Sequence, residues 1–129
     1  MRFAVIAKPI YNRILYRNLF MTLKHQQVSF TDNEIDTIVA FVHGYGANGQ
    51  DLLSLAPYFK DILPNALFIA PDAPFICDSS PFGYQWFPIN GFDEAHLMQG
   101  INNAAPILIE FLEGQLTKHN LQNKDLIII

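Results

Sequence analysis

The chain has 129 residues, of which half are hydrophobic and 16% are charged, and its formal net charge at pH 7 is −4. These values are typical of one compact globular domain and exclude an intrinsically disordered chain, which would be more polar and more strongly charged. The single cysteine, Cys77, excludes an internal disulfide and favours a reducing, cytoplasmic location. No apolar run approaches the roughly 20 residues that a membrane-spanning helix needs.

The charges are unevenly distributed along the chain. Residues 1–24 hold five basic residues and no acidic one, whereas residues 25–129 hold three basic residues and all twelve acidic ones. We therefore interpret residues 1–24 as a basic N-terminal extension and residues 25–129 as the folded domain. Nucleic-acid binding is not expected, because the few basic residues are scattered and the acidic body would repel phosphate.

Four short segments rich in β-branched, aliphatic and aromatic residues predict strands. They are residues 25–30, 37–42, 66–70 and 126–129. The last segment reads as a buried strand, because it consists of large aliphatic residues only. Helical segments separate the later strands, and this alternation predicts a mostly parallel sheet flanked by helices and joined by right-handed crossovers.

Two helices and one long loop are expected between the strands. Residues 50–60 have a helical composition, although Pro57 should kink or restart this helix. A second helix follows from an apolar stripe at three- and four-residue spacing, in which Pro106 should introduce a bend or a new start. The stripe consists of Leu97, Ile101, Ala104, Leu108, Phe111 and Leu112. Residues 75–92, rich in Pro, Gly, Ser and aromatic residues, predict an irregular and functional loop.

A glycine-rich loop after the strand at 37–42 permits two interpretations. Gly44, Gly46 and Gly49 fit the dinucleotide fingerprint G-x-G-x-x-G, but the first acidic residue that could hold a ribose is Asp72, later than the spacing of about 20 residues predicts. The alternative is an oxyanion loop, in which backbone N–H groups stabilise negative charge on a reacting carbonyl oxygen. The glycines flank Tyr45 and would let its N–H face a pocket.

Five segments, in this order and spacing, resemble the phospholipase/carboxylesterase family, which includes the acyl-protein thioesterases. They are TIVAFVHGYGANGQDLLSLAPYF, ALFIAPDAP, YQWFPI, AAPILIEFL and KDLIII. The resemblance covers residues 25–129 and implies the N-terminal half of an α/β-hydrolase sheet. It also implies cofactor-free hydrolysis of carboxylic esters, lysophospholipids or thioesters. By position, Tyr45 would supply one oxyanion N–H, and the substrate-binding residues would be His43, Gly44, Gly46, Trp86 and Phe87.

The nucleophile elbow G-x-S-x-G of this family would begin at position 130, and the catalytic Asp and His would follow it. We therefore expect a truncated or split hydrolase that lacks the catalytic Ser, Asp and His and is inactive alone. Ser79 or Ser80 with Asp93 and His96 would form only a makeshift triad. No group of residues has the ligand spacing of a metal site, and neither a metal nor a cofactor is expected.

The strand at 126–129 is the segment from which we predict a partner. In a complete hydrolase, where the strand order runs 1-2-4-3-5 and onward, this strand would lie inside the sheet. Here it becomes an edge strand with unpaired backbone groups, which favours a homodimer or a complementary fragment. Two alternative functions remain: a non-catalytic remnant that acts through this exposed edge, and a nucleotide-binding βαβ module.

Overall fold

The computed structural model describes residues 23–129, so nearly all of the predicted basic extension at 1–24 lies outside the described residues. The strands are β1 (His25–Ser29), β2 (Thr37–Ala40), β3 (Ala66–Pro71), β4 (Phe75–Ile76), β5 (Tyr84–Gln85) and β6 (Leu126–Ile128). The helices are α2 (Gly49–Leu53), η1 (Ala56–Tyr58), α3 (Glu94–Lys118) and η2 (Asn123–Asp125). No helix of this described part is both long and apolar enough to cross a lipid bilayer.

The main sheet has the strand order β1-β3-β2-β6. Strands β2, β3 and β6 are parallel, and β1 runs antiparallel to β3. The register pairs Val39 of β2 with Phe68 of β3 on one side and with Ile127 of β6 on the other. This mostly parallel sheet confirms the α/β class, and its order is that of the second to fifth strands of the expected hydrolase sheet.

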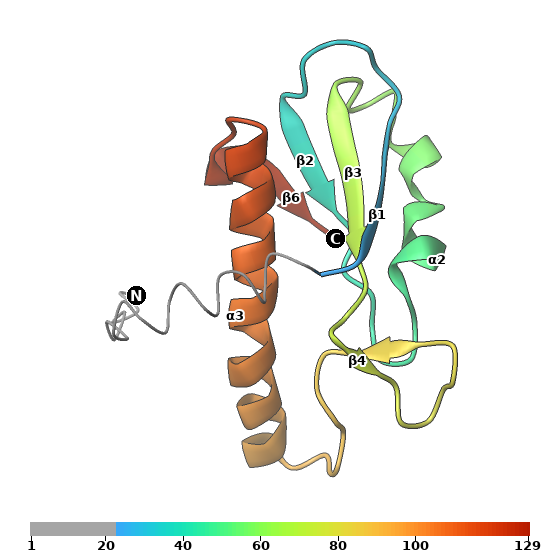
Figure 1. Cartoon of the computed structure of the whole chain (residues 1–129), viewed down its shortest axis with the longest axis vertical. Helices are drawn as coiled ribbons and strands as arrows, with labels where there is room; N and C mark the ends of the chain where they lie inside the picture. Colours follow the sequence, from blue (N-terminus) through green and yellow to red (C-terminus); the bar gives the residue numbers. More distant parts are fainter. Residues whose placement is uncertain (1–22) are drawn as a thin grey trace.

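Two hydrophobic clusters fill the two sides of the sheet. On one side, α3 packs Phe111, Leu112 and Leu116 against buried residues of β2 and β3. On the other side, Phe41 and Phe68 stack and contact the shorter α2 and η1 segment. The two helical layers are visible on opposite sides of the strands in Figure 1. Because β3 is covered on both faces, all six of its residues are buried.

The two prolines of the helical segments have different effects. Helix α2 ends at Leu53, and the chain restarts as η1 with Pro57 in its first turn, which confirms the predicted restart. At Pro106 the predicted new start is wrong, because α3 runs without interruption from Glu94 to Lys118. Buried residues lie on both sides of the proline, Ala104 before it and Phe111 after it. Burial before the proline and packing of Phe111 on the sheet after it keep the helix continuous despite the lost hydrogen bond.

Strand β6 forms one edge of the sheet, as predicted. Its backbone continues the ladder with β2, since Val42 N–H donates to Ile129 O at 2.8 Å and Ile129 N–H donates to Ala40 O at 2.9 Å. No strand of the described residues pairs with its other side. The side chains of Ile127, Ile128 and Ile129 are 39–55% exposed. The interpretation of this segment as buried was therefore wrong, because the described residues cover it only in part.

Candidate functional site

The loop between β2 and α2 lies at the carboxyl end of the parallel strands. Gly46 has a φ of +79°, in the left-handed region that favours glycine, and Ala47 N–H donates to Gly44 O at 3.2 Å to close the turn. The loop is also tied to β5: Gly46 N–H donates to Tyr84 O at 2.9 Å, and Tyr84 N–H donates to Ala47 O at 2.8 Å. These bonds fix the backbone on the C-terminal side of Tyr45.

The strands β4 and β5 form a small antiparallel hairpin that sequence reasoning missed within the predicted irregular loop 75–92. A Cβ at Gly83 would lie 2.0 Å from Gly46 O, so only glycine permits this approach of the hairpin to the oxyanion loop. The available signal was the turn-forming pair Pro81 and Gly83 ahead of an aromatic residue. The short strands, of two residues each, gave no periodicity.

The side chain and the backbone N–H of Tyr45 have different surroundings. The residue is 43% exposed, and its phenol oxygen accepts a hydrogen bond from Ser79 Oγ at 3.1 Å. Its backbone N–H has no acceptor among the described residues. Ligands of open α/β sheets bind outside the carboxyl ends of the strands, where this N–H lies. The Tyr45 N–H is therefore available to a ligand, and its role as an oxyanion donor stays a prediction.

His43 is buried beneath this loop, with 2% of its surface exposed. Its Nδ1 lies 2.7 Å from Gly44 O, and its Nε2 accepts the backbone N–H of Ala73 at 2.9 Å. Trp86 Nε1–H donates to His43 O at 2.9 Å, and the two rings lie 5.7 Å apart. Because both ring nitrogens are occupied, the ring is arranged to hold the loop and has no nitrogen available to take a proton from a nucleophile.

Two of the predicted substrate-binding residues, Trp86 and Phe87, link the predicted oxyanion loop to α3. Trp86 is half-buried against His43, and the neighbouring Phe87 packs on α3 at Gly100, where a Cβ would lie 2.2 Å from the Phe87 ring. The segment after β5 thus joins the loop and the long helix. A contact of Trp86 or Phe87 with substrate stays a prediction.

Asp72, the acid considered for a ribose, is used inside the protein. It is 8% exposed, and its Oδ1 accepts the Gly49 N–H at 2.8 Å, which anchors the first turn of α2. The same turn lies so close to β3 that a Cβ at Gly49 would be 2.3 Å from Ala70 O. With its carboxylate engaged and only five residues in α2, this loop offers little to a dinucleotide.

The residues of the makeshift triad are not brought together. Ser79 donates to Tyr45, and Asp93 accepts hydrogen bonds from the backbone N–H and the ring of His96. These bonds, the backbone one first, lower the pKa of the Asp93 carboxyl. Neither Ser79 nor Ser80 hydrogen-bonds to His96 within residues 23–129. The same residues contain no cluster of three or more His, Cys, Asp or Glu that could hold a metal ion.

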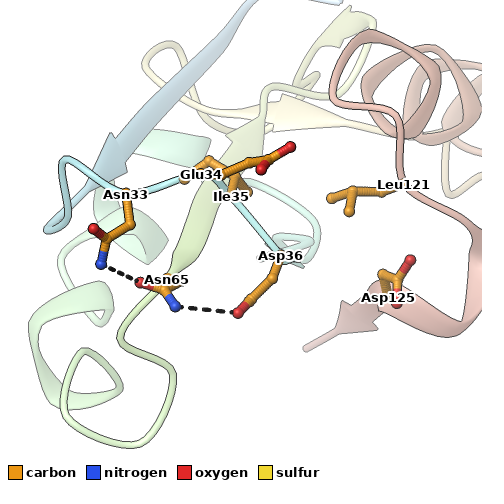
Figure 2. Close-up of a pocket in the computed structure, with 7 residues that line it drawn as sticks. All are labelled: Asn33, Glu34, Ile35, Asp36, Asn65, Leu121 and Asp125. Carbon is orange, nitrogen blue, oxygen red and sulfur yellow. Dashed lines mark hydrogen bonds between the residues drawn. The ribbon is translucent and has the colours of Figure 1, made fainter.

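A pocket of about 560 Å³ opens at the opposite end of the strands. It is lined by Asn33, Glu34, Ile35, Asp36, Asn65, Leu121 and Asp125 (Figure 2). The Asn65 amide bridges two of these residues, accepting from Asn33 Nδ2 at 3.1 Å and donating to Asp36 Oδ2 at 3.3 Å. This hollow faces away from the oxyanion loop, and no predicted site residue lines it.

Comparisons with known proteins place the chain in a family. The Phospholipase/Carboxylesterase family model matches residues 23–129. The crystal structure of esterase PE8 is similar at 31% identity with a TM-score of 0.75, over 82% of this chain and 50% of that one. A phospholipase/carboxylesterase from Dyadobacter fermentans DSM 18053 shares the fold, with a TM-score of 0.58 and 14% identity, over 83% of this chain and 46% of that one.

The chain thus spans about half the length of these two solved structures. The matched region includes the loop with the free Tyr45 N–H, the hairpin that holds it and the helix α3. Sequence pattern, sheet order and family model agree over the same residues. The chain belongs to the phospholipase/carboxylesterase family of α/β-hydrolases.

Proposed function

We propose that these 129 residues form the oxyanion-loop half of a serine hydrolase that cleaves carboxylic esters or thioesters. The observation that carries the proposal is the Tyr45 N–H, which has no acceptor among the described residues and lies between two hydrogen-bonded groups, the Gly44 carbonyl and the Gly46 N–H. In acyl transfer, negative charge develops on the carbonyl oxygen of the substrate, and a preorganised N–H stabilises it. Trp86 and Phe87 would contact the acyl chain.

The catalytic serine, histidine and aspartate would come from a second segment. Within residues 23–129 no serine is hydrogen-bonded to a histidine that also contacts an acid, so we propose that the chain alone is inactive. Strand β6 offers the attachment point, because its free edge presents unpaired N–H and C=O groups and three half-exposed isoleucines. A strand added there would extend the parallel sheet.

Hydrolysis assays on the chain, and on a fusion to the part of esterase PE8 that it does not cover, test this proposal. The chain alone should not turn over p-nitrophenyl butyrate or a butyryl thioester above background, and a fluorophosphonate should not label it. The fusion should be active. Fluorophosphonate labelling of Ser79 or Ser80 in the isolated chain, with turnover, would replace this proposal by the makeshift triad.

The Tyr45 N–H is tested within the active fusion. Tyr45→Pro removes the N–H, and loss of one oxyanion donor lowers kcat about 10²–10³-fold. Tyr45→Phe removes only the hydroxyl that Ser79 contacts and should lower kcat at most a few-fold. Equal activity of the two variants would show that the Tyr45 N–H is not an oxyanion donor.

A second candidate function, binding of a partner without catalysis, is favoured by the exposed isoleucines of β6 alone. Burying a large aliphatic side chain yields about 1.5–3 kcal/mol, so this edge should drive self-association of the isolated chain. Light scattering should find a dimer or larger species that Ile128→Lys reduces to a monomer. A wild-type monomer at high micromolar concentration would remove the basis for this candidate.

A further inference from the structure

Two successive peptide groups of the oxyanion loop have their carbonyl oxygens held by aromatic ring N–H groups. Trp86 Nε1–H donates to His43 O at 2.9 Å, and His43 Nδ1 lies 2.7 Å from Gly44 O. Both carbonyls therefore point toward buried or half-buried rings. The N–H of the second of these peptide groups, that of Tyr45, has no acceptor in the described residues.

The partners of the His43 ring determine its tautomer. The Ala73 N–H can only donate, so the Nε2 that it contacts at 2.9 Å must be unprotonated. Gly44 O can only accept, so the Nδ1 beside it must carry the proton. The neutral Nδ1–H form is the one state that satisfies both contacts, and His43 is 2% exposed, so water cannot readily replace either partner.

The orientation of one peptide group connects this ring to the candidate oxyanion site. The Gly44 carbonyl and the Tyr45 N–H belong to the same planar trans peptide, in which the C=O and N–H bonds point in opposite directions. A hydrogen bond that holds the carbonyl toward the His43 ring therefore turns the N–H away from it. Ala47 N–H also contacts this carbonyl, at the longer distance of 3.2 Å.

We infer that His43, as the neutral Nδ1–H tautomer, is a positioning residue that aims the Tyr45 N–H by holding the Gly44 carbonyl. This inference rests on the proposed ester hydrolysis. Gly44, which has no Cβ, opposes rotation of the peptide less than any other residue would. Without the ring the peptide rotates more freely, and a rotated peptide presents carbonyl oxygen in place of N–H to the developing oxyanion.

Two substitutions separate the two contacts of the ring. In His43→Asn the amide nitrogen takes the place of Nδ1, which keeps a donor for Gly44 O and loses the acceptor for Ala73. In His43→Gln the amide reaches the place of Nε2, so its oxygen accepts from Ala73 and the donor for Gly44 is lost. A merely structural role of His43 predicts similar effects of both changes on kcat.

In the active fusion, positioning predicts an unequal loss. Loss of an entire oxyanion donor costs about 10²–10³-fold in kcat, so a donor that is present but misdirected should cost about 10–100-fold in His43→Gln, with KM changed less than three-fold. His43→Asn should recover most of that loss. Equal kcat values for the two variants, or a larger loss in His43→Asn, would overturn the inference.

The isolated 129-residue chain provides a test that does not need activity. Nitrogen-15 NMR of the histidine rings, with His43 assigned by its absence in His43→Gln, should show the neutral Nδ1–H tautomer at pH 7. An Nε2–H tautomer or an imidazolium at that pH would overturn the inference. If the wild-type fusion is inactive but the tautomer is the expected one, the proposed hydrolysis fails while the hydrogen-bond arrangement stands.

Discussion

The two ends of the parallel strands differ: the candidate site lies at the carboxyl end, and an open pocket lies at the amino end. At the amino end a pocket of about 560 Å³ is open, but its polar side chains bond to one another through Asn65. At the carboxyl end the backbone is drawn into close contact, and the Tyr45 N–H, like those of His43 and Gly44, has no acceptor in the described part of the chain. The Tyr45 N–H lies where ligands of open α/β sheets bind, outside the carboxyl ends of the strands, and the pocket at the amino end does not.

The two ends also differ in how closely their residues are packed. The carboxyl end requires glycine at two contacts that a Cβ would enter, at Gly49 against β3 and at Gly83 against the oxyanion loop. The amino end consists of partly exposed polar side chains that water can also satisfy. Substitutions should therefore be far more damaging at the carboxyl end, and the predictions below test this in order of decreasing effect.

The largest loss of stability should follow Gly49→Ala. Its Cβ would meet Ala70 O at 2.3 Å, and backbone on both sides leaves little room to yield. Overpacking of this kind costs about 1–3 kcal/mol, and we expect the upper end of that range in urea unfolding. Gly114→Ala in α3 is the matched control, since nothing lies within 4 Å of its Cβ and alanine favours a helix by about 1 kcal/mol. Equal effects would contradict the close contact of α2 with β3.

Gly83→Ala should separate the β4–β5 hairpin from the oxyanion loop. The added Cβ would lie 2.0 Å from Gly46 O, but the hairpin is peripheral and can move away, so we expect a smaller cost of about 1–2 kcal/mol. Amide hydrogen exchange should quicken at Gly46 and Tyr84, whose N–H groups bond across this contact. Gly44→Ala, with open space around its Cβ, is the control in the same loop. Unchanged exchange in Gly83→Ala would show that the hairpin does not clamp the loop.

Asn65→Ala tests the amino end. The substitution removes hydrogen bonds to Asn33 and Asp36 at 3.1 and 3.3 Å and a part-buried one from the Thr31 hydroxyl at 3.3 Å. Water competes for bonds of this kind, so together they contribute about 1 kcal/mol. We expect a small loss of stability in urea unfolding and no change in ester turnover by the fusion to the complementary half of esterase PE8. A ten-fold loss of turnover would mean that the pocket, and not the oxyanion loop alone, belongs to the active site.

The sequence predicted the elements that have strong periodicity or strong local chemistry. The main strands, the later part of the apolar face of α3 and the restart at Pro57 all follow from residues that act within their own segment. The stripe was wrong at Ile101, which is 47% exposed. The interruption expected at Pro106 did not occur, because packing of α3 on the sheet outweighs the local effect of one proline. Tertiary contacts of this kind leave no local pattern to read.

The candidate site was predictable only in outline. The glycines around Tyr45 indicated an oxyanion loop, but the partners that fix it come from residues 30 to 43 positions away, Ala73 and Trp86 on His43. Asp72 appeared as a possible ribose ligand because its burial and its bond to Gly49 cannot be seen in the sequence. Long-range hydrogen bonds thus define the surroundings of the loop, which the local motif left open.

The smallest effect should appear at His119, which ends α3 at the amino end of the strands. Its Nε2 is buried and has no hydrogen-bond partner in the part of the chain that the structure describes. Burial, followed by the charge of Lys118, lowers the pKa of His119 below its ordinary value of 6.5. The unfolded chain therefore takes up a proton at higher pH than the folded chain does.

It follows that protonation of His119 favours unfolding as the pH falls. The part of the free energy of unfolding that depends on neutral His119 is fully present above pH 6.5. It is lost as the pH drops through that value toward the lowered pKa of His119. Between pH 7 and pH 5 the Tm of the wild-type chain should therefore fall more steeply than that of His119→Gln, which cannot titrate. Parallel Tm curves for wild type and His119→Gln would contradict this prediction. They would show that the His119 ring takes up its proton as readily in the folded chain as in the unfolded chain.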